Sequence, residues 1–132
     1  MKAISLKQPW GWLVVTERKT IETRTWSTSY RGDLLICASK KPTSNVALRN
    51  WFQESFGCWA MLQLRCGVAL CIAKLIDCRP MTKADEKAAM CELYPGAYAW
   101  LLADIQPIEP FAVKGSLDLY EVPLPESMRI EK

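Results

Sequence analysis

Histidine is absent from this 132-residue chain, and its absence narrows the possible chemistry more than any other feature of the composition. Without histidine there can be no Ser-His-Asp triad, no Cys-His pair and no histidine general base. The six cysteines include no CxxC pair, and no histidine is present to complete a mixed zinc site. We therefore expect no metal and no cofactor, with any catalysis resting on Lys, Glu, Asp, Cys, Tyr, Ser or Thr.

The chain also lacks an apolar run long enough to span a membrane. Its longest apolar region, residues 58–73, is short and is interrupted by Gln63 and Arg65. No charged segment followed by an apolar stretch opens the sequence, so nothing predicts secretion. We expect a cytoplasmic protein without membrane contact, whose cysteines are reduced and buried as small hydrophobic side chains.

The overall composition is typical of one folded domain. Half of the residues are hydrophobic and 23% are charged, which is a globular rather than a disordered profile. A chain of this length normally forms one core, so we predict a single domain over residues 1–132.

Positive charge is concentrated in the first third of the chain. Residues 1–41 carry eight basic and three acidic side chains, a balance of +5, whereas the remainder has a balance of −2. Such asymmetry is a modest indication of a polyanionic partner. Solvated surface charge is the alternative, because the net charge of +3 is far below that of a dedicated nucleic-acid binder.

Hydrophobic patterning predicts short strands with a few helices between them. We expect strands at 2–6, 20–26, 33–39, 67–80, 97–105 and 116–124, and helices at 9–19, 45–56 and 82–94. The first helix is apolar at nearly every position up to Val15 and should therefore be buried. Gly57 is placed to end the second helix. This order of elements favours an α+β fold with a strongly bent sheet, such as a small barrel.

The segment KTIETRTW (19–26) combines charges of both signs with a tryptophan. Strand alternation places Glu22 and Arg24 on one face. They could form a surface ion pair worth about 0–1 kcal/mol, with Lys19 an ordinary turn lysine. Alternatively they line a cleft, where Arg24 would bind phosphate and Glu22 would accept hydrogen bonds from a base. Lys19 at the lip of that cleft could then act as base or nucleophile.

The tryptophans divide into two groups. Trp51 stands at helical spacing with neighbouring apolar residues, and we interpret it, Trp12 and Trp59 as core. Trp10, two residues after Gln8, either packs in the protein or offers a stacking surface for a base. The same two alternatives apply to Trp26.

Two lysines, Lys40 and Lys41, follow the predicted strand at 33–39. They are either solvated loop residues or a phosphate-contacting patch that extends the cleft outward.

Several blocks of the sequence resemble the ASCH family, the activating-signal-cointegrator homology domain. They include the SLxQPW opening, the KxxExR core at 19–24, the RGxLLIxAS strand and the lysine pair followed by proline. The later strand segments GVALCIAKLIDC, YAWLLADIQPIEPFAVKGS and LDLYEVPL also match, and together the blocks cover most of residues 4–124. The QPW opening and the KKP block are most similar to the domain at the end of the transcriptional coactivator itself.

The resemblance implies a fold and a site. The fold is a small β-barrel with flanking short helices, similar to the RNA-binding PUA domain. The site is a cleft between the barrel and the first helix, walled by the KxxExR segment. Such a cleft is expected to accept RNA, single-stranded nucleic acid or a nucleotide-like molecule. Lys114 is named only because the resemblance includes it.

Two functions follow as expectations. In the first, the protein is a binding module that recognises RNA, single-stranded nucleic acid or a nucleotide-like molecule and acts in transcription- or RNA-related regulation. Its ligand-binding residues are Gln8, Trp10, Lys19, Glu22, Arg24, Lys40 and Lys41.

In the second, it is a small hydrolase with catalytic Lys19 and Glu22. Similar bacterial proteins are amidohydrolases of N-acylated cytidine, and others have been proposed to be ribonucleases. The amidohydrolases carry a threonine three residues after the lysine, where this chain has Glu22. Glu22 would instead act as general base on a water, with Lys19 or Arg24 stabilising the oxyanion.

Overall fold

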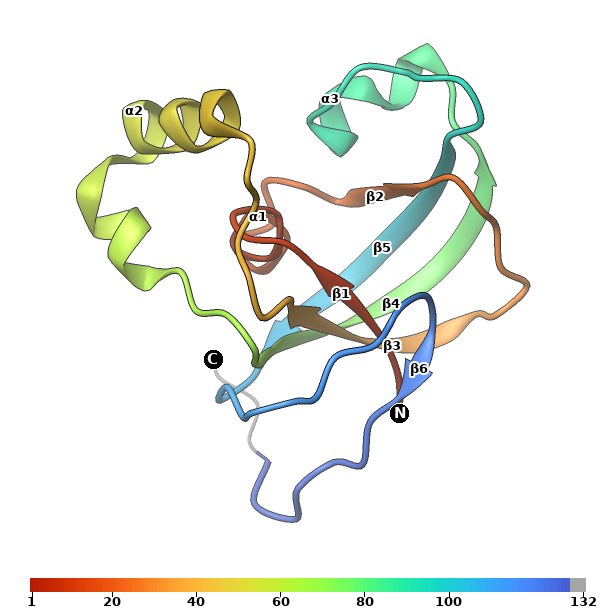
Figure 1. Cartoon of the computed structure of the whole chain (residues 1–132). Helices are drawn as coiled ribbons and strands as arrows, with labels where there is room; N and C mark the ends of the chain where they lie inside the picture. The colour runs from red at the N-terminus through yellow and green to blue at the C-terminus, as the bar shows by residue number, and fades with distance from the viewer. Residues whose placement is uncertain (129–132) are drawn as a thin grey trace.

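The computed structural model describes residues 1–128 (Figure 1). All predicted strands and helices are present, although the first and third helices and the last strand are shorter than expected. In chain order the elements are β1 (Lys2–Leu6), α1 (Trp10–Val15), β2 (Ile21–Arg24), β3 (Gly32–Ala38), α2 (Val46–Gln63), β4 (Ala69–Pro80), the 3₁₀ helix η1 (Lys83–Asp85), α3 (Glu86–Ala89), β5 (Tyr98–Pro107) and β6 (Tyr120–Glu121).

The strands form one mixed sheet in the order β2-β5-β4-β3-β1-β6. β1 and β3 are parallel, and the other neighbours are antiparallel. Register shifts interrupt the β3–β4 pairing once and the β4–β5 pairing twice. A bulge bends its strand and increases the local twist, so these shifts let the sheet curl into a half-barrel. The predicted α+β class and bent sheet are confirmed, but strand pairing leaves β2 and β6 as edges rather than closing a barrel.

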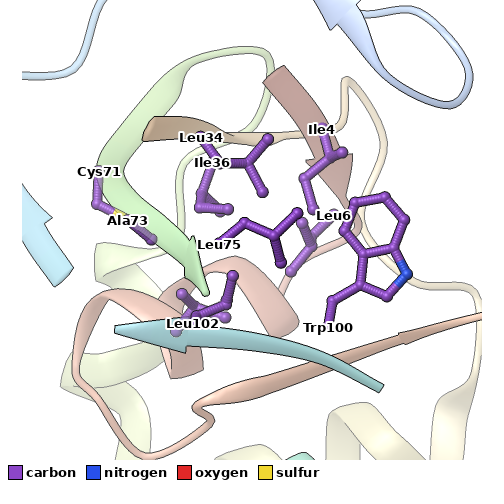
Figure 2. Close-up of a cluster of buried hydrophobic side chains, with 10 residues drawn as sticks. Ile4, Leu6, Leu34, Ile36, Cys71, Ala73, Leu75, Trp100 and Leu102 are labelled. Atoms are coloured by element: carbon purple, nitrogen blue, oxygen red, sulfur yellow. The ribbon is translucent and has the colours of Figure 1, made fainter. Parts of the chain in front are cut away.

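An apolar cluster fills the inside of the curl (Figure 2). Alternate residues of β1, β3, β4 and β5 supply it, since successive side chains of a strand point to opposite faces. Trp100 of β5 is fully buried, and Figure 2 shows it facing Ile4 and Leu6 of β1. The cluster therefore joins strands that share no backbone hydrogen bonds.

Helix α1 is buried, as its all-apolar sequence predicts, because it lies between the sheet and α2 (Figure 1). Val14 belongs to the interior cluster of the half-barrel, whereas Leu13 belongs to a second cluster that includes Phe52 of α2. Asn45 caps α2, its side chain accepting a hydrogen bond from the backbone N–H of Leu48 at 3.0 Å.

Helix α2 departs from prediction after its first half. Gly57 breaks the helical geometry with a φ of 84°, but the chain then resumes a helix to Gln63. The expectation that Trp51 and Trp59 are core residues is wrong, since their exposed fractions are 38% and 80%. Only one face of α2 packs on α1, and the spacing of apolar residues could not identify that face.

Two later elements are shorter than predicted. The helix expected at 82–94 comprises only η1 and α3, because Met90 adopts a left-handed conformation that ends α3. The strand expected at 116–124 pairs only at Tyr120–Glu121. Within residues 1–128, none of the helices combines the length and apolar character needed to cross a bilayer.

Candidate functional site

Three charged side chains, Lys19, Glu22 and Arg24, meet along β2, and we call them the charge cluster. Glu22 Oε1 lies 3.6 Å from Lys19 Nζ, and Glu22 Oε2 lies 3.2 Å from Arg24 Nε. Glu22 and Arg24 share one face of the strand, as alternation predicts. The pair does not lie on the outer surface, because the Glu22 side chain is only 11% exposed and that of Arg24 only 20%. The Glu22 carboxylate thus stands between two cations at the margin of the protein interior.

Lys19 is buried, with an exposed fraction of 2%, instead of standing at the lip of a cleft. Its Nζ donates a hydrogen bond to the carbonyl oxygen of Ala89 and lies 4.9 Å from the centre of the Trp10 ring. Burial lowers the pKa of Lys19, and the negative charge of Glu22 opposes that shift. In this position Lys19 contacts Glu22 and the Ala89 carbonyl oxygen and is shielded from solvent.

Arg24 joins two strands that are not neighbours in the sheet. Its Nη2 donates a 2.8 Å hydrogen bond to the Ser5 carbonyl oxygen of β1, across the gap where the curled sheet approaches itself. The guanidinium has five N–H groups, and the bonds to Ser5 and Glu22 occupy two of them. Within residues 1–128 the other three have no acceptor. They are therefore available to a ligand.

The segment around α3 lies about 70 residues after Lys19 in the sequence, and its backbone positions Lys19. The Ala88 carbonyl oxygen accepts a 3.0 Å hydrogen bond from the backbone N–H of Thr20, and the next carbonyl, of Ala89, accepts one from Lys19. Two consecutive carbonyl groups therefore fix the turn that leads into β2.

That segment is itself anchored by Asp85. Arg79 donates two hydrogen bonds to the Asp85 carboxylate, at 2.7 and 2.8 Å, and the Thr82 backbone N–H donates a third at 2.8 Å. The Arg79 guanidinium and the Thr82 N–H hold the pKa of Asp85 well below its usual range. The anchor belongs to β4 and η1, so the position of Lys19 depends on residues about 60 positions later in the chain.

Gln8, a predicted ligand-binding residue, is 1% exposed and both ends of its amide are engaged. Its Oε1 accepts a hydrogen bond from the backbone N–H of Trp12, and its Nε2 donates one to the Arg65 carbonyl oxygen, each at 2.9 Å. Gln8 thereby ties α1 to the residues that follow α2. Trp10 is half-buried and packs against both the interior cluster and the α1–α2 cluster.

Trp26 and Trp12 are held by packing against other aromatic side chains. Trp26 meets Trp100 edge-to-face at 4.9 Å, and its carbonyl oxygen accepts a hydrogen bond from Trp100 Nε1. Trp12 is half-buried and meets Phe52 edge-to-face at 5.1 Å.

A cavity of about 680 Å³ opens beside Ser5, and we call it the basic cavity. It lies between the ends of β1 and β3 and the segment 113–117. Its lining consists of small residues, hydroxyl groups, two lysines and two apolar side chains: Ser5, Ala38, Ser39, Lys40, Gly67, Val113, Lys114, Gly115, Ser116 and Leu117. Two residues of the sequence-based prediction, Lys40 and Lys114, thus face the same cavity. Lys41 is exposed but does not line it.

The charge cluster and the basic cavity meet at Ser5. Its carbonyl oxygen binds Arg24, and the same residue lines the cavity. Sequence reasoning missed Ser5 and Ala89, because both act on the cluster through backbone carbonyl groups, which leave no signal in a side-chain pattern. It also missed Ser39 and Ser116.

All six cysteines are free, but only Cys37 and Cys71 are fully buried, and Cys58 is exposed. Burial raises the pKa of Cys37 to about 11 and that of Cys71 to about 12, so both remain protonated near neutral pH. Within residues 1–128, His, Cys, Asp and Glu side chains form no group of three or more that could hold a metal ion.

Comparison with known proteins identifies relatives of this chain by sequence family and by fold. Residues 4–112 match the ASCH domain. No curated protein is similar enough in sequence to count as a match. Among solved structures, ASCH from Zymomonas mobilis is similar with a TM-score of 0.62 at 18% identity, over 92% of this chain and 87% of that one.

Two single-substitution variants of that Zymomonas mobilis protein are also similar. Each has a TM-score of 0.58 at 18% identity and covers 92% of this chain, with 89% and 87% of the variant chains covered. At this identity the likeness establishes the fold.

Proposed function

We propose that this chain, which belongs to the ASCH domain family, binds RNA, single-stranded nucleic acid or a nucleotide-like ligand beside its charge cluster. The kinship with RNA-binding PUA domains that the sequence resemblance implies supports this choice. So does the basic balance of residues 1–41. The physiological setting that fits such a module is transcription- or RNA-related regulation.

The observation that carries the proposal is the pairing of the buried Glu22 with the half-buried Arg24. Arg24 offers N–H groups that suit phosphate or carbonyl oxygens, and Glu22 offers acceptor oxygens that suit an amino group of a base. Both groups are fixed by protein partners before a ligand arrives, since Lys19 flanks Glu22 and Ser5 binds Arg24. A fixed donor–acceptor pair loses little side-chain entropy on binding.

Lys19 has a supporting role in this proposal. Because its ammonium group is buried, it contacts Glu22 and the Ala89 carbonyl oxygen instead of the ligand. Its contribution is to keep the Glu22 carboxylate in place. Gln8 likewise positions α1 through its two backbone hydrogen bonds.

Fluorescence anisotropy tests the proposal directly. The probe is a single-stranded RNA of mixed sequence with hydroxyl groups at both ends and a dye on an internal base. We expect salt-sensitive binding that weakens about tenfold in Arg24→Gln, because hydrogen bonds to a charged group are lost. Glu22→Gln should alter the preference among base sequences more than the affinity.

The matched control is Lys74→Gln, which removes one positive charge from an exposed position of β4. We expect its affinity for RNA to stay within about twofold of the wild type, since a charge away from the site contributes only long-range attraction. Equal weakening in Arg24→Gln and Lys74→Gln would contradict the proposal, as would a wild-type protein that binds no RNA.

A second candidate function is hydrolysis, and one observation favours it. Burial lowers the pKa of Lys19, which is how proteins prepare lysines for base or nucleophilic chemistry. Glu22 would activate a water, and Arg24 would stabilise the developing charge. Product analysis of the same RNA and of N-acylated cytidine tests this: turnover by the wild type that disappears in a folded Lys19→Met variant would make the protein a hydrolase.

A further inference from the structure

The basic cavity has features that the charge cluster alone does not explain. We propose that it binds a phosphomonoester, namely the terminal phosphate of a nucleic-acid strand or of a nucleotide. This deepens the proposed function and rests on it for the identity of the rest of the ligand. The argument follows from charge, from hydrogen-bond donors and from the position of the cavity.

The charge of the lining matches a dianion. Lys40 and Lys114 are its only charged residues, so no carboxylate opposes an incoming anion. Neither lysine forms an ion pair with any acidic side chain of residues 1–128, so both ammonium groups remain for a ligand. A phosphodiester carries one negative charge, whereas a phosphomonoester carries about −1.5 to −2 near neutral pH. Two unopposed lysines therefore favour a terminal phosphate over an internal one.

The remaining polar groups of the lining suit phosphate oxygens as well. Ser39, which follows β3, and Ser116, from the segment 113–117, both line the cavity and carry hydroxyl groups. The hydroxyl group of Ser5 is engaged with that of Tyr120 at 2.6 Å. Hydroxyl groups and lysines together supply positioned hydrogen-bond donors of the kind that phosphate sites use.

A glycine keeps the two sides of the cavity close together. A Cβ atom added at Gly115 would lie 3.2 Å from Ser5 Oγ, tighter than an ordinary contact. A side chain at residue 115 would therefore require the Ser5 hydroxyl group or the segment 113–117 to shift by a few tenths of an ångström. Its backbone is fixed at one end by the 3.1 Å hydrogen bond from Val113 N–H to the Gly67 carbonyl oxygen.

The cavity also has the right size and place. Its volume of about 680 Å³ falls within the roughly 300–1,000 Å³ of small-ligand sites. A phosphate in this cavity would lie beside Ser5, whose carbonyl oxygen accepts a hydrogen bond from Arg24. In this proposal a nucleotide whose phosphate lies among Lys40, Lys114 and the serines extends past Ser5 toward Arg24.

Four RNA probes of one sequence test the inference. They carry a 5′-phosphate, a 3′-phosphate, both phosphates or none, with the same internal dye. We expect at least one phosphorylated end to tighten binding by about tenfold. Because the second pKa of a phosphomonoester is about 6, this preference should shrink as the pH falls from about 7.5 to about 5.5.

Two variants, which together carry three substitutions, locate the effect. Lys40→Gln with Lys114→Gln in one chain should abolish the preference for the phosphorylated end. Lys41→Gln is the matched control, since Lys41 is adjacent and exposed but outside the lining, and it should keep the preference. All three side chains are exposed, so each variant should fold, which circular dichroism checks.

The outcomes separate this inference from the proposed function. RNA that binds equally well with and without terminal phosphate overturns the inference and leaves the proposed function standing. A preference that the double variant retains overturns it too. If no RNA binds, a nucleoside monophosphate and its nucleoside are titrated and followed by NMR: Lys40- and Lys114-dependent binding of the phosphorylated form supports the inference without the strand. The absence of such binding overturns it.

Discussion

The charge cluster and the basic cavity share Ser5, yet their charged residues have opposite surroundings. In the cluster, Lys19 is 2% exposed, and its ammonium group already contacts Glu22 and a backbone carbonyl oxygen. In the cavity, Lys40 and Lys114 are exposed and lack a carboxylate partner within residues 1–128. Removal of one member of a buried ion pair destabilises the fold, whereas removal of an unpaired charge at a cavity mainly weakens ligand binding.

The largest expected effect is on the cluster. Lys19→Met should lower the free energy of unfolding by about 3–5 kcal/mol, because Glu22 would lose a buried partner and the Ala89 carbonyl oxygen would lose its donor. Urea denaturation measures the change. Lys40→Met is the matched substitution in the cavity and should change the same quantity by no more than about 0.5 kcal/mol.

A double substitution sharpens this contrast. Adding Glu22→Gln to Lys19→Met removes the carboxylate that has lost Lys19 and retains only Arg24 as a partner, and this should restore part of the lost stability. If Lys19→Met and Lys40→Met lose equal amounts of stability, the buried lysine of the charge cluster matters no more to the fold than the exposed lysine of the basic cavity, and the contrast is wrong.

The next largest effect on the free energy of unfolding is expected at Asp85, which anchors the segment that holds Lys19. Asp85→Asn should cost about 1–2 kcal/mol, since it weakens the pairing with Arg79 and the cap at Thr82. The pKa of Asp85 is lowered in the folded state. Its stabilising contribution is therefore complete above the unfolded pKa of about 3.9 and is lost as the pH falls below that value.

Unfolding measured between about pH 6 and pH 3 checks this prediction. The wild type should lose stability over the acid part of this range, and Asp85→Asn should lose less, because asparagine does not titrate. If the two proteins lose stability in parallel, Asp85 is not the group responsible. An NMR titration of Lys19 in Asp85→Asn would report whether the loss of the Asp85 anchor changes the pKa of Lys19.

The sequence predicts the strands well and the environment of their charges poorly. Alternation in β2 correctly places Glu22 and Arg24 on one face. It cannot predict that Lys19 is buried, because the carbonyl oxygen that accepts its hydrogen bond belongs to Ala89, 70 positions away. Burial of that kind is set by tertiary packing, which a local pattern does not contain.

The helices and the cavity show the same limit. Helical spacing groups Trp51 with Phe52, but only Phe52 is buried, since a single face of α2 has a neighbour. Lys114 was named from a family resemblance, and the segment around it was expected to lead into a long strand. Most of residues 113–119 instead form an irregular connection, which is what gives the basic cavity its wall.

Arg24 of the charge cluster contributes to both stability and the proposed binding, and Arg24→Lys separates these two roles. Lysine keeps the charge but loses the planar fork that reaches Glu22 and Ser5 together. We expect stability to fall by about 1 kcal/mol and RNA affinity to fall about tenfold. Urea denaturation and anisotropy on one preparation measure both. Loss of stability with full affinity would assign Arg24 to the fold alone.

The smallest effect on stability is expected at Lys114, where the effect on binding is nevertheless specific. Lys114→Gln should leave the free energy of unfolding within about 0.5 kcal/mol of the wild type, because the side chain is exposed and unpaired within residues 1–128. If Lys114 contacts a phosphate of a bound strand, the slope of log K against log salt should become shallower by about 0.7. Lys41→Gln should change this slope less, since Lys41 lies outside the lining. Equal changes in the two variants would mean that the strand responds to the general charge of this surface, and the distinction between the two regions would then rest on the buried cluster alone.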